Sequence, residues 1–314
     1  MTWTIKKMIR LIEKIVEYQN PTVAGLDPKL EYVPEFIKDE CFKKYGKTLD
    51  GAAAALLEFN KALIDALYDI VPAVKPQAAY YEMYGWQGVK ALAETIAYAK
   101  SKGMYVITDG KRNDIGTTMQ AYATAHLGVT DIDGEEAEAF SADALTVNGY
   151  LGSDGINPLL KICGEKDKSI FVLVKTSNPS SGELQDKKID DKTVYETMGD
   201  MCESWGEELR GKSGYSAVGA VVGATYPEML KELREKLPHT FFLVPGYGAQ
   251  GGGAEDVKYA FDKNGIGAVI NSSRGIMCAW KKVDGATEKD FAKEARNEAL
   301  RMRDDIRKVV GEMK

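Results

Sequence analysis

Short apolar runs rich in β-branched residues recur eight times along this 314-residue chain. Most of them are separated by segments whose apolar residues have the spacing of an amphipathic helix. Strands that alternate with helices predict βα units and a parallel sheet. Because no linker or low-complexity tract interrupts the eight units, we expect one domain over residues 1–314, folded as a closed (β/α)8 TIM barrel and not as an open doubly wound sheet. The expected strands are residues 22–26, 73–75, 105–108, 144–147, 169–174, 217–222, 241–244 and 268–270, and the clearest helices are 52–69, 88–102, 192–210 and 227–236.

Three segments do not fit the repeating unit. Residues 1–20 place charged side chains among apolar ones at helical spacing, which predicts an N-terminal helix. They lack the continuous apolar core of a signal peptide or a membrane span. Residues 28–50 form a polar insertion after the first strand. The sequence is compatible with either a binding element or surface decoration here. Residues 177–191 form a second polar loop, after the fifth strand, and loops of this length are typical of lids over binding sites.

Composition excludes several classes of protein. The formal net charge of −6 argues against a general nucleic-acid binder, which usually has a basic face. The four cysteines include no C-x-x-C pair, and with only two histidines no zinc site of familiar spacing can be written. Reduced thiols in a cytoplasmic protein are the expected state of these cysteines.

Polar residues collect where the predicted strands end. In an α/β barrel the carboxyl ends of all strands meet at one rim, and active sites are built from the loops there. We therefore expect a functional site at this rim. The polar strand-end residues are Asp27, Lys75, Asp109, Lys111, Asn148, Lys175 to Ser177, Thr225, Pro245 to Gly251, and Asn271 to Arg274.

The run Asp109-Gly-Lys-Arg-Asn-Asp114 is the most specific of these strand ends. If the third strand continues to Lys111, then Asp109 and Lys111 point to the same face, because side chains alternate with period two. Carboxylates beside a lysine favour its ammonium form, which suits a site that needs a protonated lysine at neutral pH. A surface ion-pair ladder is the alternative for the motif alone. The polar ends of the other strands favour the functional site.

The seventh and eighth strand ends predict a phosphate site. Residues 246–253 are rich in glycine and expected to supply unhindered backbone N–H groups at the opening of a helix that starts near Ala254. Arg274 adds a guanidinium suited to phosphate. Two glycine-rich turns and a surface arginine are the alternative. The literal match of 246–251 to a dinucleotide fingerprint lacks the acidic residue at the next strand end, and the Walker-A-like run 206–213 follows a helix instead of a strand.

Several motifs, taken in order, resemble the orotidine 5′-phosphate decarboxylase family, and more closely its longer bacterial-type (type 2) branch. The resemblance spans about residues 22 to 275. Two departures are slight: Gly110 stands where a small or apolar residue is usual, and Gly149 replaces an expected proline. The matching segments are 23–28, 74–82, 109–118, 143–152, 174–179, 219–225, 244–252 and 271–274.

The resemblance implies decarboxylation of orotidine 5′-phosphate to uridine 5′-phosphate and CO2, without a cofactor or a metal, in de novo pyrimidine biosynthesis. It implies that Lys111 is the general acid that protonates C6 of the pyrimidine. Asp109 would lie against the substrate carboxylate, and Lys75 would link Asp109 to the ribose.

The resemblance also implies the binding residues and a homodimer. Asp27 would bind a ribose hydroxyl and Ser177 the pyrimidine amide, while Pro245 and the 177–191 lid close over the base. Gln250 and Arg274 would hold the phosphate, with Ser273 also among the substrate-binding residues. From the neighbouring subunit, Asp114, Ile115 and Thr118 would reach into the site.

Two other functions are compatible with part of this sequence pattern. Sister barrels that decarboxylate a sugar-acid phosphate or condense a pentulose phosphate use Mg²⁺ and resemble this chain at D-x-K-x-x-D. They place a glutamate two residues before the first aspartate, where this chain has Ile107, which cannot ligate a hard cation. The other alternative is a catalytically silent barrel that binds a phosphate ligand. The presence of all the proposed charged groups argues against it.

Overall fold

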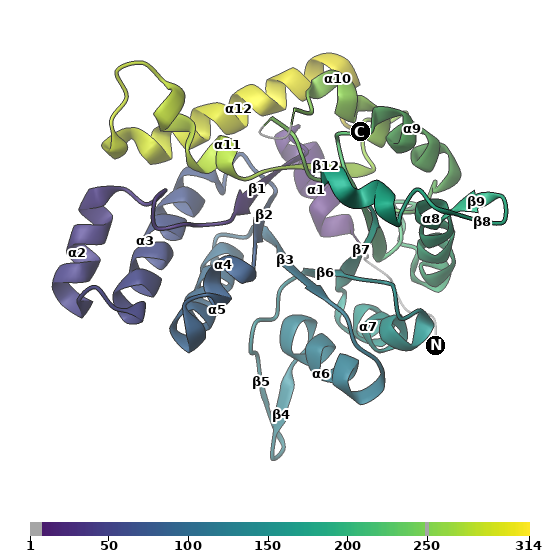
Figure 1. Cartoon of the computed structure of the whole chain (residues 1–314), viewed down its shortest axis with the longest axis horizontal. Helices are drawn as coiled ribbons and strands as arrows, with labels where there is room; N and C mark the ends of the chain where they lie inside the picture. Colours follow the sequence, from purple (N-terminus) through teal and green to yellow (C-terminus); the bar gives the residue numbers. More distant parts are fainter. Residues whose placement is uncertain (1–7, 249–250) are drawn as a thin grey trace.

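The computed structural model describes residues 8–248 and 251–314 and shows a closed barrel of eight parallel strands surrounded by helices (Figure 1). The strand order around the barrel is β1-β12-β11-β10-β7-β6-β3-β2, so the predicted (β/α)8 architecture is confirmed. Each predicted strand matches a barrel strand to within a few residues. The barrel strands are β1 (Thr22–Leu26), β2 (Ala73–Pro76), β3 (Tyr105–Arg112), β6 (Ala144–Val147), β7 (Ser169–Lys175), β10 (Val218–Val222), β11 (Phe242–Val244) and β12 (Ala268–Ser272).

Helices pack around the sheet, and all the described ones except α1 come after the first barrel strand in the chain (Figure 1). They are α1 (Ile9–Tyr18), α2 (Glu35–Tyr45), α3 (Leu49–Leu67), α4 (Ala79–Glu82), α5 (Gly85–Ser101), α6 (Gly116–Leu127), α7 (Ser153–Lys166), α8 (Val194–Trp205), α9 (Pro227–Lys236), α10 (Ala254–Val257), α11 (Arg274–Met277) and α12 (Phe291–Val310). Two antiparallel hairpins stand outside the barrel. They are formed by β4 (Thr130–Ile132) with β5 (Glu135–Ala137), and by β8 (Lys188–Ile189) with β9 (Lys192–Thr193). None of the described helices is long and apolar enough to cross a membrane.

The strands are apolar on both faces because both faces are buried. Val23 and Ile107 belong to the cluster inside the barrel, whereas their neighbours Ala24 and Val106 pack outward among the surrounding helices. This alternation is the period-two pattern of a strand, applied to a sheet that has no solvent-facing side. The barrel is therefore filled by side chains below the rim and can be open only at its ends.

Helix α1 closes the lower end of the barrel. Leu11 and Ile15 are fully buried in the same cluster as the inward-facing strand residues. Arg10 forms an ion pair of 2.5 Å with Asp143, whose carboxylate also accepts a hydrogen bond of 2.8 Å from the Val106 backbone N–H. The predicted N-terminal helix is thus confirmed from Ile9 onward, and residues 1–7 lie outside the described part of the chain.

The insertion at residues 28–50 differs from the expected polar loop. Its middle part is helix α2, whose Ile37 and Cys41 join the core cluster that contains α3. Thr48 ends the insertion as the N-cap of α3, with its hydroxyl oxygen accepting a hydrogen bond of 3.2 Å from the Gly51 N–H. The alternating charges of the segment hid a narrow apolar face, which is why the sequence pattern read as polar.

We expect Arg10→Ala to lower the free energy of unfolding by about 1–3 kcal/mol, because it leaves the buried Asp143 carboxylate without its cation. The measurement is equilibrium unfolding in urea. Lys308→Ala is the control, since Lys308 is paired with Asp305 at 3.1 Å but its side chain is 73% exposed. The control should change stability by less than about 0.5 kcal/mol. Equal losses in the two variants would show that the Arg10–Asp143 pair is no more important than a surface pair.

Candidate active site

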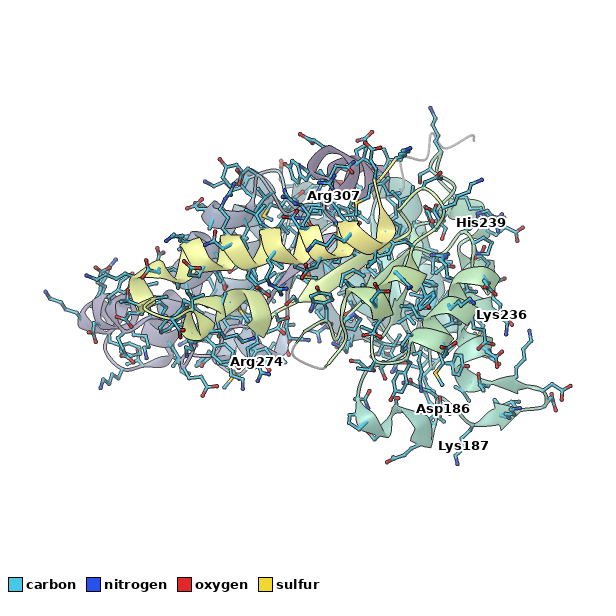
Figure 2. All side chains as sticks on the ribbon, turned by 90° about the horizontal axis from the view of Figure 1, so that it is seen from above. Asp186, Lys187, Lys236, His239, Arg274 and Arg307 are labelled. Atoms are coloured by element: carbon cyan, nitrogen blue, oxygen red, sulfur yellow. The ribbon has the colours of Figure 1, made fainter. Side chains whose placement is uncertain are left out.

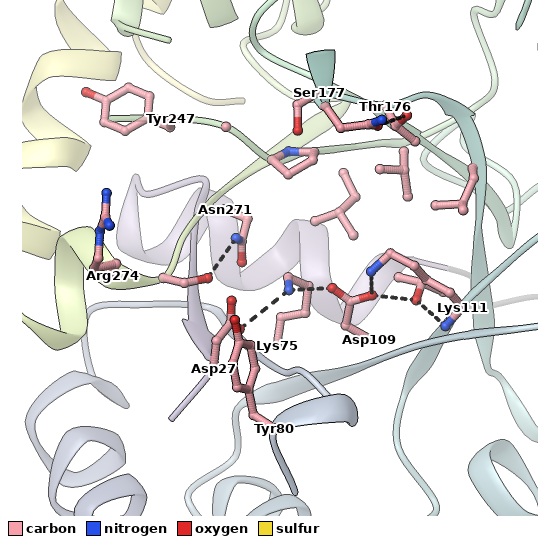
Figure 3. A pocket seen from close by; sticks show the side chains of 18 of the residues that line it. Asp27, Lys75, Tyr80, Asp109, Lys111, Thr176, Ser177, Tyr247, Asn271 and Arg274 are labelled. Atoms are coloured by element: carbon pink, nitrogen blue, oxygen red, sulfur yellow. Dashed lines mark hydrogen bonds and ion pairs between the residues drawn. The ribbon is translucent and has the colours of Figure 1, made fainter. Parts of the chain in front are cut away.

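A cavity of about 700 Å³ opens at the carboxyl ends of the barrel strands, where the sequence placed the site (Figure 3). Of the predicted site residues, Asp27, Lys75, Asp109, Lys111, Ser177, Pro245, Ser273 and Arg274 line it. Asp114, Ile115 and Thr118 do not. Gln250 lies outside the described residues. The ends of six barrel strands, β1, β2, β3, β7, β11 and β12, therefore bring most of the predicted groups to one cavity.

Asp109 is the centre of the charged cluster on the cavity wall. Its Oδ2 lies 2.7 Å from Lys75 Nζ, and its Oδ1 lies 2.6 Å from Lys111 Nζ (Figure 3). Asp27 Oδ1 is 4.0 Å from Lys75 Nζ. Strands β1, β2 and β3 are neighbours in the barrel, so these four side chains form a continuous row of alternating charge.

Opposite charges set the protonation states of Asp109 and Lys75. Burial alone would raise the pKa of Asp109, but the two ammonium groups outweigh burial and hold its pKa well below the usual range. Burial alone would likewise lower the pKa of Lys75, yet Asp109 and Asp27 outweigh it and raise that pKa. Asp109 is therefore a carboxylate and Lys75 an ammonium at neutral pH.

The backbone of β3 is irregular where it carries these groups. Lys111 has a left-handed φ of +46°, and the pairing of β3 with β6 shifts register between Thr108 and Arg112. The predicted meeting of Asp109 and Lys111 is confirmed, but regular alternation along a strand is not its cause. The irregular turn brings the Lys111 side chain back to Asp109.

Thr146 on β6 is a site residue that the sequence reasoning missed. Its hydroxyl donates a hydrogen bond of 2.8 Å to Asp109 Oδ1 and accepts one of 3.0 Å from the Lys111 backbone N–H. It therefore fixes both the carboxylate and the turn. Thr146 sits inside the apolar run of residues 144–147, where a threonine looks like ordinary strand material, so the sequence held no signal for it.

Two acceptors in the cavity are open. Asp27 Oδ1 and Asn271 Oδ1 are buried and have no hydrogen-bond partner among the described residues. Asn271 had been placed at a strand end by the sequence but not assigned to the site. Buried acceptors without partners are costly unless a ligand satisfies them. Both are therefore positioned for donors such as sugar hydroxyl groups.

The segment 177–191 is attached to the barrel by Lys175, which does not line the cavity. Lys175 is fully buried, and its ammonium lies 2.5 Å from Asp186 Oδ1 and 3.2 Å from Ser181 Oγ. Gln185 Oε1 accepts a hydrogen bond of 2.9 Å from the Thr176 N–H. Asp186 and Lys187 stand out from the body of the barrel (Figure 2), while the base of the segment holds Ser177 at the cavity.

The glycine-rich loop departs from the expected anion cradle. The N–H groups of Gly248, Gly251 and Gly252 donate to carbonyls of the same loop, and the Gly253 N–H donates to Asp256. These four N–H groups are therefore used within the loop itself. Helix α10 begins at Ala254 as predicted but has only four residues. Arg274 at the start of α11 is a cation that lines this side of the cavity.

Ile107, at the position where metal-dependent sister barrels carry a glutamate, is fully buried in the apolar interior of the barrel. It does not line the cavity. The donor chemistry required by Mg²⁺ is thus missing at that position for a physical reason, because the side chain there is a hydrocarbon that packs in the core.

Comparison with known proteins decides the family. Residues 48–288 match the model of the orotidine 5′-phosphate decarboxylase / HUMPS family. The chain belongs to this family. It is 45% identical over 289 residues to orotidine 5′-phosphate decarboxylase of Rhodopirellula baltica, covering 91% of this chain and 94% of that one. It is 42% identical over 304 residues to the enzyme of the same name from Clostridium tetani, covering 96% and 99% of the two chains.

A solved structure of the family has the same fold. The structure of Leishmania donovani OMP decarboxylase is 31% identical, with a TM-score of 0.71, and the match covers 95% of this chain and 99% of that one. The orotidine 5′-phosphate decarboxylase family membership and the barrel predicted from the sequence are therefore both confirmed.

We expect Asp109→Asn to lower the free energy of unfolding at pH 7 by about 3–5 kcal/mol, because it leaves the buried Lys75 ammonium without its nearest partner. The pKa of Asp109 is lower in the folded chain than its unfolded value of about 3.9. Its stabilising effect is therefore complete above that value and is lost as the pH falls through the folded pKa. The difference between the parent and the variant should be constant from neutral pH down to about pH 5 and shrink below about pH 4.

Urea unfolding at a series of pH values measures this difference. Asp284→Asn removes an exposed carboxylate and is the control, with an expected change within about 0.5 kcal/mol. A difference for Asp109→Asn that grew as the pH fell would contradict the charge assignment.

Proposed function

We propose that this protein converts orotidine 5′-phosphate to uridine 5′-phosphate and CO2 in de novo pyrimidine biosynthesis. The observation that carries the proposal is the Lys111 ammonium held 2.6 Å from a buried carboxylate, Asp109, which Lys75 and Thr146 hold from the other sides. A cavity of about 700 Å³ at the same point is large enough for a nucleotide. The proposed reaction uses neither a cofactor nor a metal.

The reaction needs a proton donor at one carbon atom. The bond between C6 and the carboxylate breaks, CO2 leaves, and the electron pair stays on C6, where no π-system is aligned to accept it. Lys111 Nζ stabilises that charge and gives its proton to C6. An ammonium already in place is effective because it requires no reorganisation at the moment of reaction, and more so once water is excluded.

Asp109 has two effects on the substrate. It holds Lys111 in position, and its negative charge lies beside the place where the substrate carboxylate binds. Departure of CO2 therefore relieves the repulsion between the two carboxylates. Enzymes lower barriers by roughly 8–23 kcal/mol, which is more than one such contact supplies. The rest must come from binding energy of the remote phosphate and ribose groups, used to assemble the charged row around the base.

The substrate would lie across the cavity from Arg274 to Lys111. Arg274 and Ser273 bind the phosphate at one end, with Gln250 proposed as a further phosphate ligand. The open acceptors of Asp27 and Asn271 receive ribose hydroxyl groups, and Lys75 lies beside them. Ser177 contacts the pyrimidine amide, and Pro245 with the 177–191 segment covers the base.

We also propose a homodimer in which Asp114, Ile115 and Thr118 complete the neighbouring site. These residues lie outside their own cavity, at the start of α6. Ile115 is 50% exposed, and the nearby loop before α7 exposes Tyr150 (73%) and Leu151 (44%), an apolar surface of the kind that packs in subunit interfaces. Gly155 lets α7 approach this segment closely, since a Cβ there would lie 2.8 Å from the Asp114 carbonyl oxygen. The four buried cysteines are consistent with the reducing cytoplasm, which is the location we propose.

Purified protein should convert orotidine 5′-phosphate in excess chelator, followed by the loss of substrate absorbance. Lys111→Ala should lower kcat by about 10³-fold or more, because the stabilising charge and the proton donor are both lost. Lys308→Ala is the matched control for removing a lysine and should leave kcat unchanged. Turnover that requires added Mg²⁺, or normal turnover by Lys111→Ala, would contradict the proposal.

A mixture of two inactive variants tests the shared site. Lys111→Ala and Asp114→Ala homodimers should each be nearly inactive. After unfolding and refolding together, random pairing makes half of the dimers mixed, and each mixed dimer has one site with both residues intact. The mixture should therefore recover about a quarter of the parent activity. If Asp114 served its own subunit, no intact site would form and no activity would return.

A further inference from the structure

Arg112 follows the proposed general acid directly in sequence but does not line the cavity. Its guanidinium makes contacts with three different elements around the end of β3. Nη1 donates a hydrogen bond of 3.1 Å to the Gly110 carbonyl, and Nη2 forms an ion pair with Glu82 at the end of α4. Nε donates to His126 Nε2 on α6 at 3.4 Å. The guanidinium also lies over the Tyr122 ring, 5.5 Å from its centroid.

These contacts surround the irregular turn that carries Lys111. A left-handed φ of +46° is unfavourable for a residue with a side chain, so the turn persists only if neighbouring groups hold it. Gly110, just before it, has no side chain to restrict its own backbone. On the cavity side the Lys111 N–H is held by Thr146 at 3.0 Å. On the other side the Gly110 carbonyl is held by Arg112.

Arg112 also ties together the two strands that supply the charged row. Glu82 belongs to α4, which follows β2 and its Lys75 almost directly. The backbones of β2 and β3 remain joined beyond their regular pairing, because the Ala78 N–H donates to the Asp109 carbonyl at 3.2 Å. The Lys75–Asp109 pair therefore joins the two strand ends inside the cavity, and the Arg112–Glu82 pair joins them outside it.

His126 is suited to accept a hydrogen bond from Arg112. It is buried and stacked on Phe140, with ring centroids 4.9 Å apart. Burial, together with the charge of Arg112, lowers the pKa of His126 to about 4. The imidazole is therefore neutral at physiological pH and can present an unprotonated Nε2 to the guanidinium. The surroundings of Arg112 thus provide an acceptor for each of its three nitrogen atoms.

We propose that Arg112 is a positioning residue for the decarboxylation: by holding the Gly110 carbonyl and Glu82 at once, it keeps the Lys111 ammonium at Asp109. This inference rests on the proposed function and goes beyond it, since Arg112 does not line the cavity and its polar contacts are with Gly110, Glu82 and His126. A planar fork with several donors is needed because the carbonyl, the carboxylate and the imidazole lie in different directions. A lysine at this position could satisfy only part of this set.

Steady-state kinetics on Arg112→Ala and Arg112→Lys test the proposal. We expect kcat to fall about 100-fold in Arg112→Ala, the loss typical of a catalytic group displaced by about 1 Å, with little change in KM. Arg112→Lys should also have a lower kcat than the parent. Calorimetric titration with uridine 5′-phosphate should give the parent affinity for both variants, because the binding residues are unchanged.

Chemical rescue separates positioning from a general loss of structure. Added guanidinium ion, at concentrations too low to unfold the chain, should partly restore kcat of Arg112→Ala and show saturation. Arg296→Ala is the matched control: Arg296 Nη1 forms an ion pair of 2.5 Å with Asp69, far from the cavity on α12. Its kcat should stay at the parent value, and guanidinium should not change it.

Glu82→Gln provides a second variant that keeps Arg112 in place. It should lower kcat by a smaller factor, without rescue by guanidinium. An unchanged kcat in Arg112→Ala overturns the proposal. A combined loss of kcat, nucleotide affinity and thermal stability without rescue also overturns it, because that pattern marks a purely structural role. If the parent chain itself has no turnover, the proposed function fails and this inference fails with it. If the parent chain is active and Arg112→Ala has the parent kcat, only this inference fails, so the two failures are distinguishable.

Discussion

The buried carboxylate of Asp109 is the constraint on which the rest of the site depends. A carboxylate in this position is costly to remove from water, and it is stabilised there by two ammonium groups at 2.7 and 2.6 Å and by the Thr146 hydroxyl. Conversely, Lys75 can be a buried cation because the carboxylates of Asp109 and Asp27 are beside it. Each charge is tolerated because the others are present. The row therefore holds a protonated lysine at a fixed point, as the proposed chemistry requires.

The barrel makes such a row possible because the residues that stabilise the fold and the residues of the site lie in different parts of it. Its interior below the rim is filled with apolar side chains and closed at the lower end by α1, where Leu11 and Ile15 are buried. The upper rim carries the charges. Neighbouring parallel strands end beside one another, so side chains from β1, β2, β3 and β6 meet although they are far apart in the chain. A rigid lower half supports a polar rim that would not be stable alone.

Different parts of the structure were predictable to different degrees, for physical reasons. Strands buried on both faces appear as continuous apolar runs, so β1 matches its prediction at both ends. Helix α2 was missed because its apolar face is narrow. Thr146 was missed because a threonine within an apolar strand gives no sign of its partner. The backbone N–H groups of Gly248, Gly251 and Gly252 are hydrogen-bonded within their own loop, which a glycine-rich sequence does not reveal. Patterns that report burial are visible in a sequence, whereas individual hydrogen bonds between distant segments are not.

The sequence alone determined the fold class, the rim on which the site lies and the chemistry of most groups there. It could do so because alternating strand and helix patterns permit few topologies, and because the carboxyl ends of parallel strands must meet. Only the tertiary structure decided how Asp109 and Lys111 come together, through a left-handed turn where alternation had been assumed. It also decided that Thr146 holds this turn from inside and Arg112 from outside. Those contacts join β3 to β6, α4 and α6. These segments come close enough to form hydrogen bonds only when the chain has folded.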